Sequence, residues 1–124
     1  NKAVIKPQYG SGLNKIAKVL KRNPGSSALI EGHADRTKKS KADYNKRLSK
    51  RRAQAVLNFI AESGSIDRKR MKAVGYGFER PKVPHDLING TPENRRVDVY
   101  LRGVDEDLSG MDFTTIEDVA PEDK

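Results

Sequence analysis

The sequence contains no cysteine and no tryptophan, and aromatic residues make up only 6% of its 124 residues. Without cysteine, disulfide bonds, thiolate nucleophiles and cysteine-ligated zinc are excluded, while both cytoplasm and periplasm remain open. No apolar run approaches the roughly 18 residues that span a bilayer. The opening NKAVIKP has neither an initiator methionine nor the features of a signal peptide, so we expect a fragment of a longer protein.

Size and charge predict one polar domain followed by an acidic tail. Hydrophobic residues make up 35% of the chain and charged residues 34%, which is polar but within the globular range. Residues 105–124 hold eight acidic residues and one lysine, whereas the preceding residues hold 24 basic and nine acidic ones. Such an acidic, weakly periodic stretch is typical of an extended segment. We expect a domain over 1–103 and a flexible tail over 104–124, either solvated or lying on the basic body.

Hydrophobic periodicity predicts strands that alternate with helices. The first helix follows Pro7 and ends at RNPG (22–25), and the second covers about 42–63. Strands are expected over 3–5, 27–35, 71–77 and 95–103. This order predicts an α+β fold, a two-layer sandwich whose helices pack on one face of a small mixed four-stranded sheet (βαβαββ-like).

Arg52 interrupts the apolar stripe of the second predicted helix. At about 100° per residue, it falls between Phe59 and Val56 on the side of the helix that carries Leu48. Its guanidinium either extends outward, pairs with an internal acid, or receives an external anion, and periodicity leaves all three open. Asn45 shares this side about two turns earlier. A polar pair here predicts the mouth of a pocket.

Asp35 lies at the end of the second predicted strand, just before this helix. The carboxyl end of a strand and the following loop commonly line the ligand crevice of a βα unit. Asp35 either caps a turn or pairs with Arg36 or a lysine, or it supplies an anionic group to such a crevice. In the last case, Asp35 and Arg52 would suit a zwitterion, with the ammonium on the acid and the carboxylate bound bidentately by the arginine.

Four stretches resemble the OmpA C-terminal (OmpA-like) domain family. They are IEGHAD, YNKRLSKRRAQAVLNFI, VGYGFERP and NRRVDVYL, which are similar to the family patterns G-H-[TA]-D, Y-N-x-x-L-S-x-x-R-A, G-Y-G-x-x-x-P and N-R-R-V in that order. The resemblance covers about residues 1–103. It implies a periplasmic domain of the Gram-negative envelope, associated with the outer membrane or cell wall. Such a domain binds peptidoglycan non-covalently through the diaminopimelate of the stem peptide.

The resemblance also implies which residues hold the ligand. Asp35 of G-H-x-D and Arg52 of L-S-x-x-R-A match the principal ligand residues of the family. The remaining ligand-binding positions implied are Asn45, Leu48, Arg95 and Asn1. Two loops that we expect beside the ligand depart from the family pattern. The loop 36–43 lacks the usual glycine, and the segment 89–93 is shortened. We also expect a membrane-embedded or lipid-anchored part upstream of Asn1, and a homodimer stays open.

The basic segment 36–52 supports an alternative hypothesis. It holds nine lysines and arginines against Asp43 alone, a pattern typical of an electrostatic binder of nucleic acid or another polyanion. Tyr44 is its only aromatic residue, and the chain contains no recognisable nucleic-acid module. We therefore keep polyanion binding as the second hypothesis.

The sequence predicts no enzyme, no cofactor and no metal centre. His33 and Asp35 are spaced as a pair of metal ligands, but two ligands are too few for a stable site, and His85 lies in a distant loop. A packed or capping His33 is the preferred interpretation. No nucleophile with a matching base can be argued from the spacing.

Overall fold

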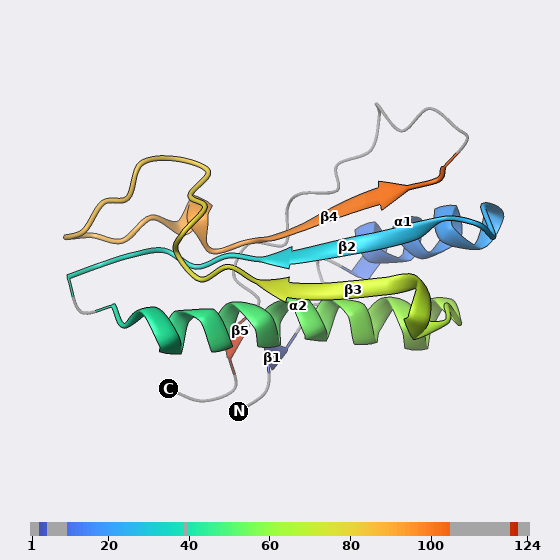
Figure 1. The fold of residues 1–124 in the computed structure, drawn as a ribbon, viewed down its shortest axis with the longest axis horizontal. Coiled ribbons are helices and arrows are strands. Elements are labelled where there is room, and N and C mark those ends of the chain that lie inside the picture. Colours follow the sequence, from blue (N-terminus) through green and yellow to red (C-terminus); the bar gives the residue numbers. More distant parts are fainter. Residues whose placement is uncertain (1–2, 5–9, 39, 105–119, 122–124) are drawn as a thin grey trace.

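The computed structural model describes residues 3–4, 10–38, 40–104 and 120–121, which carry colour in Figure 1. The elements are β1 (Ala3–Val4), α1 (Gly10–Arg22), β2 (Ser27–Gly32), α2 (Ala42–Gly64), β3 (Met71–Gly75), β4 (Val97–Arg102) and β5 (Ala120–Pro121), with 3₁₀ turns η2 (Arg68–Arg70) and η3 (Pro92–Asn94). Both predicted helices and all four predicted strands are present. β2 ends three residues earlier than predicted, and the expected start of the first helix near Pro7 lies outside the described residues.

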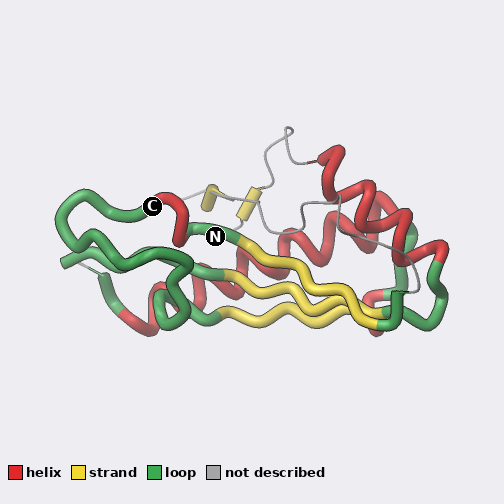
Figure 2. Tube along the Cα trace, turned by 90° about the horizontal axis from the view of Figure 1, so that it is seen from above, coloured by secondary structure: helices red, strands yellow, loops and turns green. Residues whose placement is uncertain are grey.

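The main sheet has three strands in the order β3-β2-β4. β2 runs parallel to β3 and antiparallel to β4, with Ile30 opposite both Ala73 and Val99. The mixed sheet and the α+β class are therefore as predicted. In Figure 2 both helices lie on one side of the three strands, which makes two layers.

The prediction of a fourth strand in this sheet was wrong. β1 pairs instead with β5 in a separate antiparallel ladder, with Ala3 opposite Pro121 and Val4 opposite Ala120. Both short strands contact α2 (Figure 1). The apolar residues of β1 predict a strand but not the strand with which it pairs. That strand, β5, lies in the acidic tail, where we expected no regular structure. The rest of the tail, 105–119 and 122–124, lies outside the described residues.

The core lies between the helices and the sheet. Alternation along the strands sends Ile30, Val97 and Val99 toward the helices, with exposures of 0%, 0% and 2%. The core residues among those described are Leu13, Ile16, Ala17, Leu20, Ala28, Ile30, Ala53, Val56, Leu57, Ile60, Ile66, Met71, Ala73, Val97 and Val99. This packing fixes α2 across the sheet.

Two glycines let the backbone of α2 touch the sheet directly. A Cβ on Gly32, at the end of β2, would lie 1.9 Å from the carbonyl oxygen of Ser49, and a Cβ on Gly75, at the end of β3, would lie 2.5 Å from the amide nitrogen of Lys50. The hydroxyl of Ser49 also accepts a hydrogen bond from the backbone of Gly77 (2.9 Å). Residues of the G-H, L-S and G-Y-G motifs therefore contact one another, and this contact positions α2 beside the ends of β2 and β3.

Candidate ligand-binding site

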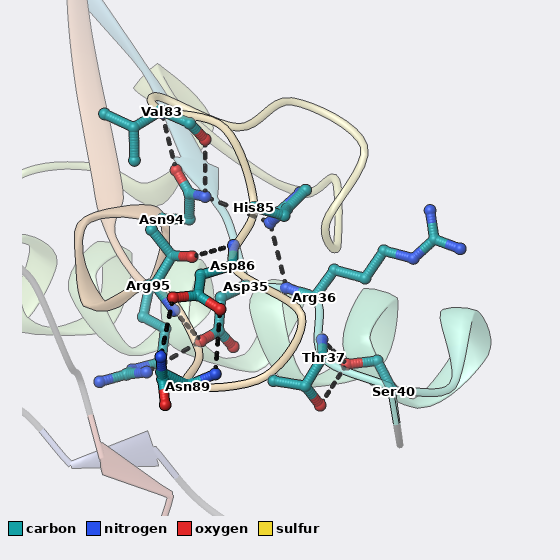
Figure 3. Close-up of polar contacts among 11 residues, drawn as sticks. Asp35, Arg36, Thr37, Ser40, Val83, His85, Asp86, Asn89, Asn94 and Arg95 are labelled. Atoms are coloured by element: carbon teal, nitrogen blue, oxygen red, sulfur yellow. Dashed lines mark hydrogen bonds and ion pairs between the residues drawn. The ribbon is translucent and has the colours of Figure 1, made fainter.

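Asp35 lies three residues beyond β2, and its carboxylate is held in one orientation. Oδ2 accepts hydrogen bonds from Nη1 of Arg95 and from the backbone of Thr91, both at 2.9 Å (Figure 3). The side chain of Asp35 is 15% exposed and that of Arg95 32%. Neither of these bonds uses Oδ1. Among the described residues, the charged partner of Asp35 is thus Arg95, and not Arg36 or a lysine as the alternative interpretation had it.

The loop that carries Arg95 is organised by Asn94. This fully buried side chain accepts hydrogen bonds from the backbones of Lys82 (2.7 Å) and Val83 (3.0 Å) and donates one to the carbonyl of Val83 (2.9 Å). This role was not predicted from the sequence, although Asn94 is the first residue of the N-R-R-V stretch. These bonds fix the proline-rich loop to the residue that precedes Arg95 and so help to position Arg95.

The segments before α2 and before β4 are joined at the same end of the molecule. His85 Nδ1 accepts a hydrogen bond from the backbone of Arg36 (3.2 Å), and the backbone of Lys38 donates to the carbonyl of Leu87 (3.1 Å). Figure 3 shows His85, Arg36 and Asp35 in this cluster. Nearby, hydrogen bonds from the backbone and side chain of Asn89 lower the pKa of Asp86. The rim loops therefore brace each other around Asp35.

A cavity opens at the start of α2. Its volume is about 250 Å³, and it is lined by Thr37, Ser40, Lys41, Tyr44 and Asn45. Asn45 is 8% exposed, and its side-chain amide donates to the carbonyl of Lys41 (3.1 Å). Ser40 Oγ accepts from the backbone of Thr37 (2.8 Å), so the altered loop before α2 forms part of the wall. Asn45 therefore lies at a cavity without Arg52, its predicted partner at a pocket mouth, and its part in ligand binding stays a prediction.

Arg52 and Leu48 lie on the buried face of α2. Arg52 is 5% exposed and Leu48 8%, on the face that also carries Val56 and Ile60. The guanidinium therefore turns inward, which removes the alternative in which it extends into solvent. Neither residue lines the cavity beside Asn45. Asn1 lies outside the described residues.

His33 and Asp35 do not face a common centre. Nε2 of His33 lies 3.5 Å from Oε1 of Glu31 and 3.6 Å from Oδ2 of Asp98, whereas Asp35 faces Arg95. Burial and the cationic Arg96 lower the pKa of His33 to about 4. The spacing of His33 and Asp35, already judged too poor in ligands, therefore makes no metal pair, and His33 is buried, in line with the preferred interpretation.

None of the described helices combines the length and the apolar composition that a membrane crossing requires. The sequence profile of the OmpA family matches residues 1–95. The chain belongs to the OmpA family.

Relatives within the OmpA family agree with this assignment. Outer membrane protein Omp38 of Acinetobacter baumannii is 34% identical over 103 residues, which are 83% of this chain and 28% of Omp38. The peptidoglycan-associated lipoprotein of Brucella melitensis is 37% identical over 101 residues, 82% of this chain and 58% of the lipoprotein. The chain thus spans between about a quarter and three fifths of these proteins. Their names agree with the predicted place of this OmpA-family chain in the Gram-negative envelope.

Solved structures of the family share the fold. The crystal structure of the peptidoglycan-associated lipoprotein from Burkholderia pseudomallei superposes with a TM-score of 0.71 at 29% identity, covering 82% of this chain and 84% of that one. The C-terminal domain of Helicobacter pylori MotB gives a TM-score of 0.69 at 21% identity, covering 88% and 84%. The fold of this OmpA-family chain is therefore independently supported.

Proposed function

We propose that this OmpA-family domain binds peptidoglycan non-covalently, without catalysis, through the diaminopimelate of the stem peptide. It would hold an envelope protein to the cell wall, in line with the peptidoglycan-associated lipoproteins to which it is similar. The observation that carries the proposal is the carboxylate of Asp35, which Arg95 and the backbone of Thr91 hold in one orientation.

Asp35 is suited to the ammonium group of the ligand. Arg95 and the backbone of Thr91 both bind Oδ2 and fix the plane of the carboxylate. The bonds that described residues make to this side chain leave Oδ1 for an incoming donor. A carboxylate held in advance loses little conformational freedom on binding, which favours affinity.

Arg52 is suited to the carboxylate group of the same ligand. A guanidinium offers two parallel N–H donors that match a carboxylate, and such bonds are stronger away from water. At 5% exposure the side chain is shielded from solvent. It lies near the middle of α2, the helix that β1 and β5 contact.

A small cavity lies beside Asn45. Its volume of about 250 Å³ lies below the roughly 300–1,000 Å³ of sites for drug-sized ligands. Asn45 offers an amide at its wall, and neither Asp35 nor Arg52 lines it. We therefore assign to this cavity a part of the ligand next to the zwitterionic centre, and not the centre itself.

Co-sedimentation with purified sacculi tests the proposal. Arg52→Ala and Arg52→Lys should each lose binding, because neither keeps the two parallel donors. Asp35→Asn should lose it as well. The matched controls are Arg47→Ala and Asp43→Asn, exposed charges on α2, which should bind like the wild type. Wild-type binding by both Arg52 variants and by Asp35→Asn would refute the site.

Salt and competition separate this proposal from polyanion binding. Binding through many cations weakens steeply with salt, whereas capture of one zwitterion depends on salt weakly. Free diaminopimelate should displace the domain from sacculi, and an excess of double-stranded DNA should not. Displacement by DNA together with a steep salt slope would favour the polyanion hypothesis, for which no relative named above gives support.

We also propose that residues 1–103 form the binding unit and that 104–124 is a separate tail. All core residues among those described precede residue 104. A chain ending at Gly103 should keep its near-UV circular dichroism and its binding to sacculi. Unfolding of that chain would show that β5 is an integral part of the domain.

A further inference from the structure

A second group of buried polar side chains lies on the face of the sheet that turns away from the helices. Glu31 in β2 stands directly opposite Asp98 in β4. His33 follows two residues after Glu31 and therefore points to the same face. Their exposures are 8% for Glu31, 4% for Asp98 and 1% for His33. Neither the wall-binding proposal nor the family motifs use this group as a unit.

The imidazole of His33 is aimed between the two carboxylates without a hydrogen bond. Nε2 lies 3.5 Å from Oε1 of Glu31 and 3.6 Å from Oδ2 of Asp98. Among the described residues, neither ring nitrogen of His33 has a hydrogen-bond partner. A buried polar group in that condition is costly, and a ligand atom between the three side chains would relieve the cost.

The spacing of the three side chains is that of ligands around one metal ion. Zinc bonds of about 2.0–2.2 Å to nitrogen and oxygen, at a tetrahedral angle, separate ligand atoms by about 3.3–3.6 Å. The two distances at Nε2 match this range, and one ligand atom from each residue lies within 4.8 Å of the others.

The surroundings hold these side chains in place. The backbones of His33 and Arg96 exchange two hydrogen bonds (2.8 and 3.3 Å), and the ring of His33 stacks on Tyr76 at 5.6 Å between centroids. Nε of Arg96 donates to Oδ2 of Asp98 (3.0 Å), a bond of the kind that orients a metal-ligating carboxylate.

We propose that Glu31, His33 and Asp98 form a binding site for one divalent transition-metal ion of the zinc class, on the face of the sheet opposite α2. One imidazole and two carboxylates suit zinc better than magnesium or calcium, which prefer all-oxygen sites. A fourth position would be taken by water. Such an ion would tie β2 to β4, so its role would be structural, and the proposal is independent of peptidoglycan binding.

Calorimetric titration of the untagged, EDTA-treated domain with Zn²⁺ at pH 7 tests this site. We expect one equivalent of Zn²⁺ to bind and Mg²⁺ to give no heat. Glu31→Gln and Asp98→Asn keep the side-chain shape and should each weaken Zn²⁺ binding at least about tenfold. Glu62→Gln, which changes an exposed acid of α2, should bind like the wild type.

Nuclear magnetic resonance of the wild-type domain tests the site without any variant, so the result does not depend on whether the variants fold. Long-range ¹H–¹⁵N spectra report the ring nitrogens of each histidine. Zn²⁺ should shift those of His33 and leave those of His85 in place. The proposal is overturned if no one-equivalent binding occurs, if the shifted ring is that of His85, or if folded Glu31→Gln and Asp98→Asn bind Zn²⁺ as the wild type does.

Discussion

The carboxylate of Asp35 and the guanidinium of Arg95 form an ion pair at 2.9 Å across 60 residues of sequence. The pair joins the segment after β2 to the segment before β4, and the backbone of Thr91 adds a second bond to the same oxygen. Arg95 therefore orients the acid that we assign to the ammonium of the ligand. The two loops that depart from the family pattern, 36–43 and 89–93, approach each other beside this ion pair, since Gly90 lies close to both Asp35 and Thr37.

Arg95→Gln should weaken binding to sacculi less than Asp35→Asn does. The variant removes the charge that orients Asp35, while the bond from Thr91 remains. Because Arg95 is about one third exposed, loss of the ion pair should change the free energy of unfolding by no more than about 1 kcal/mol. Co-sedimentation and urea denaturation measure the two effects. Arg102→Gln, which changes an exposed cation of β4, is the control. Identical binding by Arg95→Gln and Arg102→Gln would contradict the orienting role of Arg95.

Ser49→Ala should destabilise the domain by about 1–3 kcal/mol. The hydroxyl of Ser49 is fully buried, accepts from the backbone of Gly77 (2.9 Å) and donates to the carbonyl of Lys46 (2.9 Å). Its removal leaves a buried N–H group without its acceptor. Urea denaturation measures the loss, with Ser63→Ala at an exposed position of α2 as the control. Equal stability of Ser49→Ala and wild type would show that another acceptor replaces the hydroxyl.

Gly32→Ala and Gly12→Ala should change stability in opposite directions. A methyl group on Gly32 meets the backbone of Ser49, which cannot move without displacing α2, whereas a methyl group on Gly12 in α1 meets nothing within 4 Å. The first change should cost about 3 kcal/mol or prevent folding. The second should stabilise by about 0.5–1 kcal/mol, since alanine favours a helix over glycine. Thermal denaturation distinguishes them, and a tolerated Gly32→Ala would refute the close contact of α2 with β2.

The sequence was sufficient for those features that depend on local periodicity. Both helices, the main strands and the place of Arg52 on the apolar side of α2 follow from the spacing of apolar residues, whereas the inward direction of its guanidinium was one of three open alternatives. The motif glycines were identified, but their reason was not, because it depends on the packing of α2 against strand ends.

Features that depend on distant partners were not predictable. The tail partner of β1, the pairing of Asp35 with Arg95 and the meeting of Glu31 with Asp98 all arise from strand pairing or loop contacts between remote segments. Asn94 was overlooked because an asparagine that supports a loop has no periodic signature.

Acid should destabilise the domain through His33. In the folded chain its pKa is about 4 instead of 6.5, owing to burial and to the cations Arg96 and Arg80. Between these values the unfolded chain binds a proton that the folded chain does not, so stability is fully present above pH 6.5 and is lost as the pH falls. At pH 5 this amounts to about 2 kcal/mol.

The carboxyls that face His33 modify this loss, so a variant is needed to isolate it. Burial raises the pKa of Glu31, which adds stability as the pH falls and offsets part of the effect. Asp98 faces the same ring. In EDTA, wild type should lose about 2 kcal/mol more between pH 7 and pH 5 than His33→Gln, as measured by urea denaturation. Equal losses would mean that His33 is protonated in the folded domain at pH 5.

The most direct test of the wall-binding account is a crystal structure of the domain with diaminopimelate at saturating concentration. The account predicts one molecule bound with its ammonium on Asp35 and the carboxylate of the same centre on the guanidinium of Arg52. Diaminopimelate bound elsewhere, or absent from this position in crystals that leave the start of α2 open to solvent, would contradict it.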